Sequence, residues 1–176
     1  MKAFIDNLDI NVIKKTKEKI VFDISGIEPP LANALRRIMI AEIPTMAIEK
    51  VNLWQNTSII PDENLAHRLG LVPILADPRM FEDRGADQEF SENNSIKFNL
   101  HVKCTKKDPN TPMALNNTID EEKLYNHANV YSSDLVWEPM GNQLKKFGKD
   151  GIRPLHDDIL IAKLRPGQEI EMELFC

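Results

Sequence analysis

Apolar and polar residues alternate over several stretches of the chain, and this pattern predicts strands. The strictest alternation covers 96–104, where every second residue is apolar. That period is typical of a strand with one buried face and one solvated face. Weaker alternation predicts further strands over 19–26 and 130–137. Over 45–55 both alternating sets contain apolar residues, which favours a central strand covered on both faces.

Two other stretches have the period of a helix. Pro29-Pro30 supplies the backbone angle of a first helical turn, and apolar residues then recur at helical spacing until Pro44. A helix is therefore predicted over 31–42. A shorter helix is predicted over 62–69, with Asp62 as its N-cap and Gly70 as a left-handed residue after its end.

The last part of the sequence predicts a hairpin. The apolar runs 159–164 and 169–176 flank Arg165-Pro166-Gly167-Gln168, and Pro followed by Gly is the usual centre of a type II turn. Polar and proline-interrupted segments elsewhere are predicted to be loops: 76–94, 106–117 and 141–151.

Composition restricts the class of protein. The 176 residues carry 22 Lys plus Arg and 27 Asp plus Glu, a net charge of -5, and 42% are apolar. A mildly acidic globular chain is not expected to bind nucleic acid directly, because neutralising phosphates requires a basic face. The sequence has no run of eighteen apolar residues and no secretory leader pattern, so we expect an intracellular chain that does not span a membrane.

Candidate catalytic chemistry is sparse. The two cysteines, Cys104 and Cys176, are too few for a cysteine-rich metal site, and we expect no cofactor. His156-Asp157-Asp158 could collect a divalent ion, as in a metal-dependent hydrolase, if acidic residues of 77–83 folded beside it. Ordinary turn chemistry before the apolar run from Ile159 is the favoured alternative.

The predicted first helix carries the most informative pattern. Its apolar row recurs at i, i+3, i+4, i+7 and i+8: Leu31, Ala34, Leu35, Ile38 and Met39. Its other side presents Asn33, Arg36 and Arg37, and neighbouring guanidinium groups can bind carboxylates of a partner in bidentate fashion. The pattern alone leaves two possibilities open, a helix that covers its own core and a helix that binds another helix.

The same helix carries a resemblance to a known family. The segment LANALRRIMIAEIPT at 31–45 resembles the alpha motif of the assembly subunits of DNA-dependent RNA polymerases. NTSIIPDE at 56–63 and LAHRLGLVPI at 65–74 resemble the second block of that family. Within the family the sequence is most similar to the larger alpha-like subunits shared by eukaryotic RNA polymerases I and III, through segments that include 76–79, 156–162 and 164–170.

The resemblance implies an α+β fold in which a dimerisation domain receives an inserted, mostly β domain. The implied boundaries are 1–62 for the first segment of the dimerisation domain, 63–160 for the insert and 161–176 for the return. Sequences of the family continue past the position of Cys176, so the resemblance covers about the N-terminal half of a subunit. The polymerase II counterpart has a cysteine-ligated metal site in the insert, which two cysteines cannot build.

The resemblance also implies a function. Such subunits are non-catalytic; they pair with a smaller alpha-like subunit through the first helix and form the platform on which the largest and second-largest subunits assemble. The implied contact with the second-largest subunit is at Arg36 and Arg37, with Asn33 beside them. The expected location is the nucleus, including the nucleolus, and the products are ribosomal, 5S and transfer RNA. A stand-alone interaction adaptor is the alternative that stays open.

Overall fold

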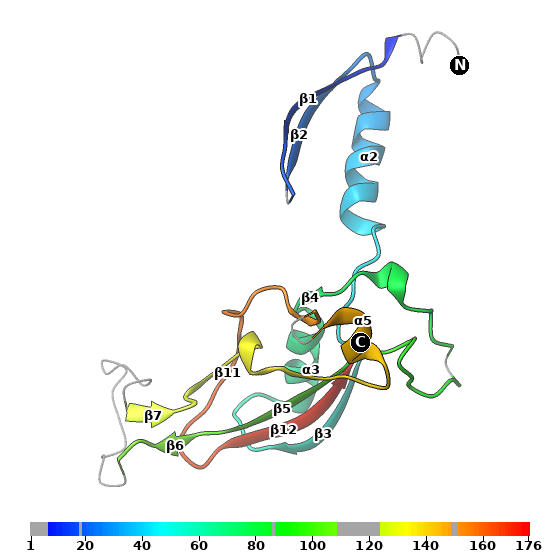
Figure 1. Ribbon diagram of the computed structural model, residues 1–176. Coiled ribbons are helices and arrows are strands. Elements are labelled where there is room, and N and C mark those ends of the chain that lie inside the picture. The colour runs from blue at the N-terminus through cyan, green and yellow to red at the C-terminus, as the bar shows by residue number, and fades with distance from the viewer. Residues whose placement is uncertain (1–6, 18, 86, 109–123, 149–150) are drawn as a thin grey trace. The chain divides into compact units, whose positions relative to one another are not determined.

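The computed structural model of the chain describes residues 7–17, 19–85, 87–108, 124–148 and 151–176. The chain divides into two compact units, Met1–Pro44 and Thr45–Cys176. Figure 1 shows their elements.

The first unit contains an antiparallel strand pair and a helix. Strands β1 (Asp9–Lys15) and β2 (Ile20–Ser25) pair with Ile10 opposite Ile24 and Val12 opposite Phe22. Strand β2 confirms the strand predicted over 19–26, whereas β1 was not predicted. Helix α2 (Pro29–Ala41) confirms the predicted first helix.

The second unit is built on a four-stranded antiparallel sheet with the strand order β3-β12-β5-β9. Its strands are β3 (Lys50–Asn56), β12 (Glu169–Phe175), β5 (Lys97–Lys103) and β9 (Val136–Glu138). Strand β12 lies between β3 and β5 and pairs with both over seven-residue strands. Helix α3 (Asp62–Gly70) confirms the second predicted helix and lies beside this sheet (Figure 1).

Short elements complete the second unit. Three further two-stranded pairs are antiparallel: β4 (Ile74–Leu75) with β10 (Arg153–Pro154), β6 (Thr105–Lys106) with β7 (Tyr125–Asn126), and β8 (Asn129–Tyr131) with β11 (Leu160–Lys163). Single helical turns or short helices are η1 (Pro78–Met80), η2 (Ser132–Asp134) and α5 (Gln143–Phe147). Strands β8 and β9 with η2 between them confirm the interrupted strand predicted over 130–137.

The hydrophobic core lies in the second unit. The alternation over 96–104 is confirmed, because its apolar side chains are at most 5% exposed while His101 and Lys103 on the other face are exposed. Leu65 and Leu69 of α3 and the inward residues of β12 close this core. Among the described residues, every buried apolar side chain belongs to 48–175 and none to the first unit.

Several predictions of topology were wrong. Strand β3 lies at the edge of its sheet rather than in the centre, and Trp54 on it is 67% exposed. The turn of the expected hairpin exists, with Gly167 at φ 92° and the Gln168 amide donating to the Arg165 carbonyl, but the strands it joins belong to different sheets. Strand β11 pairs with β8, whereas β12 pairs with β3 and β5.

Local predictions also need correction at helix ends and in one loop. Asp62 does not cap α3, because Pro61 is the N-cap residue and the Asp62 carboxylate accepts the Asn56 amide at 2.6 Å. Gly70 does not adopt the left-handed conformation, because its φ is not positive. Within 141–151 the structure has helix α5, and its buried Gln143 donates to the carbonyls of Glu92 and Ser95.

The remaining sequence predictions concern loops, domains and membranes. Among the described residues of the loop expected over 76–94, η1 is the only regular element, and most of 106–117 lies outside the described residues. The segments 1–62, 63–160 and 161–176 refer to the organisation of a whole subunit and stay a prediction. Among the described helices, none has the length and apolarity needed to cross a bilayer.

Candidate protein-binding helix

Helix α2 forms where its sequence has unusually clear boundary signals. Glu28 is the N-cap residue in an extended conformation, and its carbonyl accepts the amides of Leu31 and Ala32. Prolines at the first two positions have no amide to leave unsatisfied and favour the helical φ. At the other end the Glu42 amide donates to the Ile38 carbonyl at 3.0 Å.

The apolar row of α2 is accessible. The exposed fractions are 46% for Leu31, 37% for Leu35, 45% for Ile38 and 45% for Met39, and Ala34 lies within the same row. No residue of the helix is buried among the described residues. An apolar row at helical spacing normally faces a core. Within the described residues this row faces no buried core, which favours a helix that binds another helix over a helix that covers its own core.

The polar side of α2 carries the two arginines. Each turn of the helix advances 3.6 residues, so Asn33, Arg36 and Arg37 project away from the apolar row. Asn33 Oδ1 accepts two hydrogen bonds from Arg36, from Nε at 3.1 Å and from Nη2 at 2.8 Å. The Arg37 side chain makes no hydrogen bond or ion pair with a described residue. One guanidinium is thus oriented by its neighbour, and the other is free to bind a carboxylate.

Sequence reasoning missed one residue of this polar side. Ile40 follows Arg36 by four positions and Arg37 by three, which places it next to both on the helix surface. It is 71% exposed. The signal was an apolar residue out of phase with the apolar row. An exposed isoleucine between two guanidinium groups gives this side an apolar centre as well as charge.

The candidate triplet His156-Asp157-Asp158 makes structural contacts. The carboxylate of Asp157 lies 3.7 Å from Arg153, and the backbone carbonyl of His156 accepts the Ser132 hydroxyl at 2.5 Å. Asp77, one of the acids expected to join the triplet, binds Arg79 at 2.7 Å, and this hydrogen bond lowers the pKa of Asp77. These contacts support turn chemistry around η2, and within the described part of the chain residues 156–158 do not belong to a group of side chains close enough to share an ion.

Another group of possible metal ligands lies on the exposed face of the sheet. Ligand atoms of His101, Glu169 and Glu171 lie within 4.8 Å of one another. The Glu169 carboxylate is already bound by Lys103 at 2.9 Å and by His101 at 2.9 Å, and these hydrogen bonds lower the pKa of Glu169. The Lys103 ammonium already supplies the positive charge that the Glu169 carboxylate binds, so the group is an ion-pair network on the sheet surface.

The two thiols are also structural. Cys104 and Cys176 are not joined in a disulfide, and Cys104 is fully buried in the core. Burial raises the pKa of Cys176 to about 12, which keeps its thiol protonated at neutral pH. The Cys176 thiol is therefore not in the ionised state that a nucleophile or a metal ligand requires.

Comparison with known proteins gives one family. Residues 51–176 match the family model "RNA polymerase Rpb3/RpoA insert domain". The chain is 48% identical over 174 residues to the mouse DNA-directed RNA polymerases I and III subunit RPAC1, an alignment that covers 98% of the chain and 49% of the relative.

More distant relatives show the same coverage. The subunit of the same name in Saccharomyces cerevisiae is 41% identical over 180 residues, which covers 100% of the chain and 52% of the relative. The DNA-directed RNA polymerase subunit Rpo3 of Methanothermobacter thermautotrophicus is 34% identical, with 94% and 53% covered. The chain therefore spans about half the length of the curated relatives it matches.

Proposed function

The chain belongs to the RNA polymerase Rpb3/RpoA insert-domain family, and on this premise we propose that it acts as a non-catalytic assembly subunit of DNA-directed RNA polymerases I and III. The observation that carries the proposal is the exposed apolar row of α2 together with a pair of accessible arginines on the opposite side of the helix. The proposed role is to hold other subunits in place, which requires binding surfaces rather than an active site. Catalysis belongs to the large subunits.

The proposed partner of the apolar row is the smaller alpha-like polymerase subunit. The four large side chains of the row retain a little under half of their exposure in the described chain. Burying what remains would contribute on the order of 3–5 kcal/mol, at 1.5–3 kcal/mol for each complete side chain. Ala34 keeps the middle of the row low, so another helix can approach closely. The expected product is a heterodimer with α2 at its centre.

The proposed partner of the polar side is the second-largest polymerase subunit. Arg36 is held by Asn33, and Arg37 is unpaired among the described residues. A guanidinium that is already oriented loses little freedom when it binds a carboxylate. The heterodimer would then present Asn33, Arg36 and Arg37 to acidic residues of that subunit, and the largest subunit would join the platform afterwards.

The proposed role implies which RNA products the chain serves and where in the cell it acts. As part of polymerases I and III, the chain would serve the synthesis of ribosomal, 5S and transfer RNA in the nucleus, including the nucleolus. Its own contacts would be with protein, since its net charge of -5 disfavours direct binding of nucleic acid.

Co-expression with the smaller alpha-like subunit tests the proposal. Size-exclusion chromatography with mass determination should show a one-to-one complex. Ile38→Asp places a charge in the apolar row and should abolish the complex, because a buried unpaired carboxylate is strongly unfavourable. Ile40→Asp makes the same change on the other side of the same helix and should leave the complex intact. Separate elution of the two wild-type subunits, or equal loss in both variants, would contradict the proposed dimer face.

A stand-alone interaction adaptor is the second candidate, because an exposed apolar row would also serve that role. The two functions differ in their complexes. An assembly subunit co-purifies with the large polymerase subunits from cells, whereas an adaptor co-purifies with other proteins and not with those subunits.

A further inference from the structure

A small pocket lies between α3 and the four-stranded sheet. Its volume is about 220 Å³, and it is lined by Val51, Leu53, Asp62, Glu63, Ala66 and Met172. Pockets for small-molecule ligands usually measure roughly 300–1,000 Å³. The size of this pocket suits one long side chain of another protein better than a metabolite.

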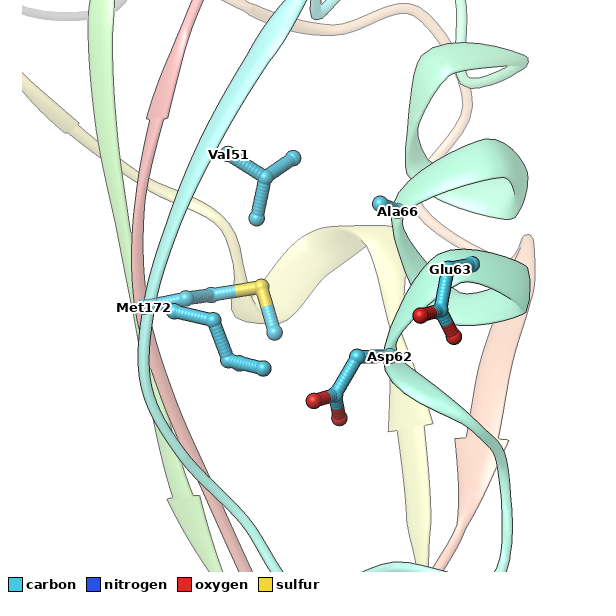
Figure 2. A pocket seen from close by; sticks show the side chains of 6 residues that line it. Val51, Asp62, Glu63, Ala66 and Met172 are labelled. Atoms are coloured by element: carbon cyan, nitrogen blue, oxygen red, sulfur yellow. The ribbon is translucent and has the colours of Figure 1, made fainter.

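The floor of the pocket, formed by the lining residues below its acidic rim, is apolar. Figure 2 shows Val51 and Met172 on the sheet side of the pocket and Ala66 on the helix side. Leu53 of β3 also lines the pocket. Ala66 has the smallest side chain of the lining, so it leaves space between α3 and the sheet. Met172 is only 2% exposed, and its flexible thioether can adapt to an inserted chain.

The rim of the pocket is acidic. Asp62 and Glu63 lie in the first turn of α3, and Figure 2 shows both carboxylates beside the opening between the helix and the sheet. Asp62 accepts the Asn56 amide at 2.6 Å, whereas the Glu63 carboxylate has no hydrogen-bond or ion-pair partner among the described residues. Acidic residues stabilise a helix N-terminus, but that effect does not require an apolar pocket below them.

An apolar floor with an acidic rim matches the two parts of a lysine side chain. The methylene stem of lysine buries well against apolar surface while its ammonium stays at the edge. A compact ammonium can lie between two separate carboxylates, whereas the planar guanidinium of arginine is suited to a bidentate contact with a single carboxylate. We propose that this pocket receives a lysine side chain from another polymerase subunit; the inference rests on the proposed function.

Zero-length cross-linking tests the proposal in the assembled enzyme. The polymerase is purified through a tag on the subunit that contains this chain, treated with a carbodiimide, and digested for mass spectrometry. Carbodiimides join a carboxylate to an amine only when the two are in contact. The expected product is an amide between Asp62 or Glu63 and a lysine of another polymerase subunit.

A pair of variants on one helix separates the pocket from simple surface proximity. Ala66→Phe fills the pocket and leaves both carboxylates in place, so it should abolish the cross-link. Asn64→Phe introduces the same side chain at an exposed position outside the pocket lining and should preserve it. Thermal unfolding of both variants shows whether they fold, and the smaller Ala66→Val, which should weaken the link, replaces Ala66→Phe if that variant does not.

The outcomes are distinct. Three results would overturn the lysine proposal and leave the assembly function standing. They are a cross-link that persists in both Ala66 variants, cross-links that join only lysines of this chain or of a second copy, and the absence of any cross-link in an intact polymerase. Failure of the tagged subunit to co-purify with polymerase would overturn both.

Discussion

Arg68 ties helix α3 to strand β11 through two consecutive backbone carbonyls. Its Nε donates to the Ile161 carbonyl at 2.9 Å and its Nη2 donates to the Leu160 carbonyl at 2.7 Å. The register between β8 and β11 shifts between Leu160 and Ala162, so the strand ladder is interrupted where the guanidinium binds. An interrupted ladder leaves backbone groups that need another partner. Arg68 supplies it and fixes the helix to a second sheet.

Replacing Arg68 by Met should lower the free energy of unfolding by about 1–3 kcal/mol, because two carbonyls lose a charged donor. Arg68→Lys should recover part of the loss, since it retains a cationic donor but not the fork. Urea denaturation measures both. The neighbouring His67 is exposed, and His67→Met serves as the matched control with an expected change within about 0.5 kcal/mol. Equal effects at 67 and 68 would contradict this role of Arg68.

Lys97 should give the stability a measurable pH profile. Its ammonium lies 2.8 Å from Glu173 and 3.0 Å from Glu138. The hydrogen bond to Glu173 is the largest cause, and the bond to Glu138 the next, of a pKa of Lys97 above 10.5. The pKa of Glu138 lies below 4.5, chiefly because of its hydrogen bond from Lys97 and next because of the bond from Asn99.

The sign follows from linkage. Glu138 stabilises the folded chain above pH 4.5 and loses this effect as the pH falls through its folded pKa, whereas Lys97 stabilises it below pH 10.5 and loses this effect as the pH rises through its folded pKa. The difference in unfolding free energy between wild type and Lys97→Met should therefore be largest between these limits and shrink outside them. Lys163→Met at an exposed position should show a flat difference. A flat difference for Lys97→Met would refute the coupling.

Gly167 should resist substitution for purely conformational reasons. Its φ is +92°, and an added Cβ would meet nothing within 4 Å. Gly167→Ala therefore tests backbone strain alone, and the expected loss is about 1–2 kcal/mol of unfolding free energy. Gly85→Ala is the matched control, since Gly85 does not have a positive φ and its Cβ would make only ordinary contacts. A neutral Gly167→Ala would mean that the turn adjusts without cost.

Charge reversal at the two arginines of α2 should separate assembly from folding. Arg36→Glu with Arg37→Glu should abolish incorporation into polymerase, because carboxylates of the partner would then face like charge. Both positions are exposed, so the thermal unfolding of the isolated chain should change little. Co-purification of the large subunits with the tagged variant is the measurement. Normal recovery of those subunits would show that the arginines have another role.

Elements with a strong local signal were predictable from sequence. Helix α2 has prolines at both ends and a regular apolar row, and β5 alternates without a break. The exposure of the α2 row was not predictable, because a core helix and a binding helix have the same pattern. The resemblance to polymerase subunits, rather than the pattern, favoured binding.

Pairing between distant segments was not predictable. The Pro166-Gly167 turn is a local property, but the partners of the strands on either side depend on tertiary packing, and here β11 and β12 enter different sheets. The apolar residues of β3 suggested a central strand, whereas Val51 and Leu53 instead line the pocket under α3. That pocket combines residues from three elements, the most distant of which, Val51 and Met172, are 121 positions apart, and no spacing rule joins them.

The position of β12 has a consequence for biosynthesis. In the sheet, β3 and β5 are not neighbours, and each pairs with the strand at 169–175 that the ribosome makes after both. Until that strand emerges, the nascent chain carries an unpaired β3 and a β5 whose sole described partner is the short β9. Unpaired edges promote aggregation. The sheet therefore closes only after the strand at 169–175 has been synthesised, and until then β3 and β5 can associate with strands of other chains.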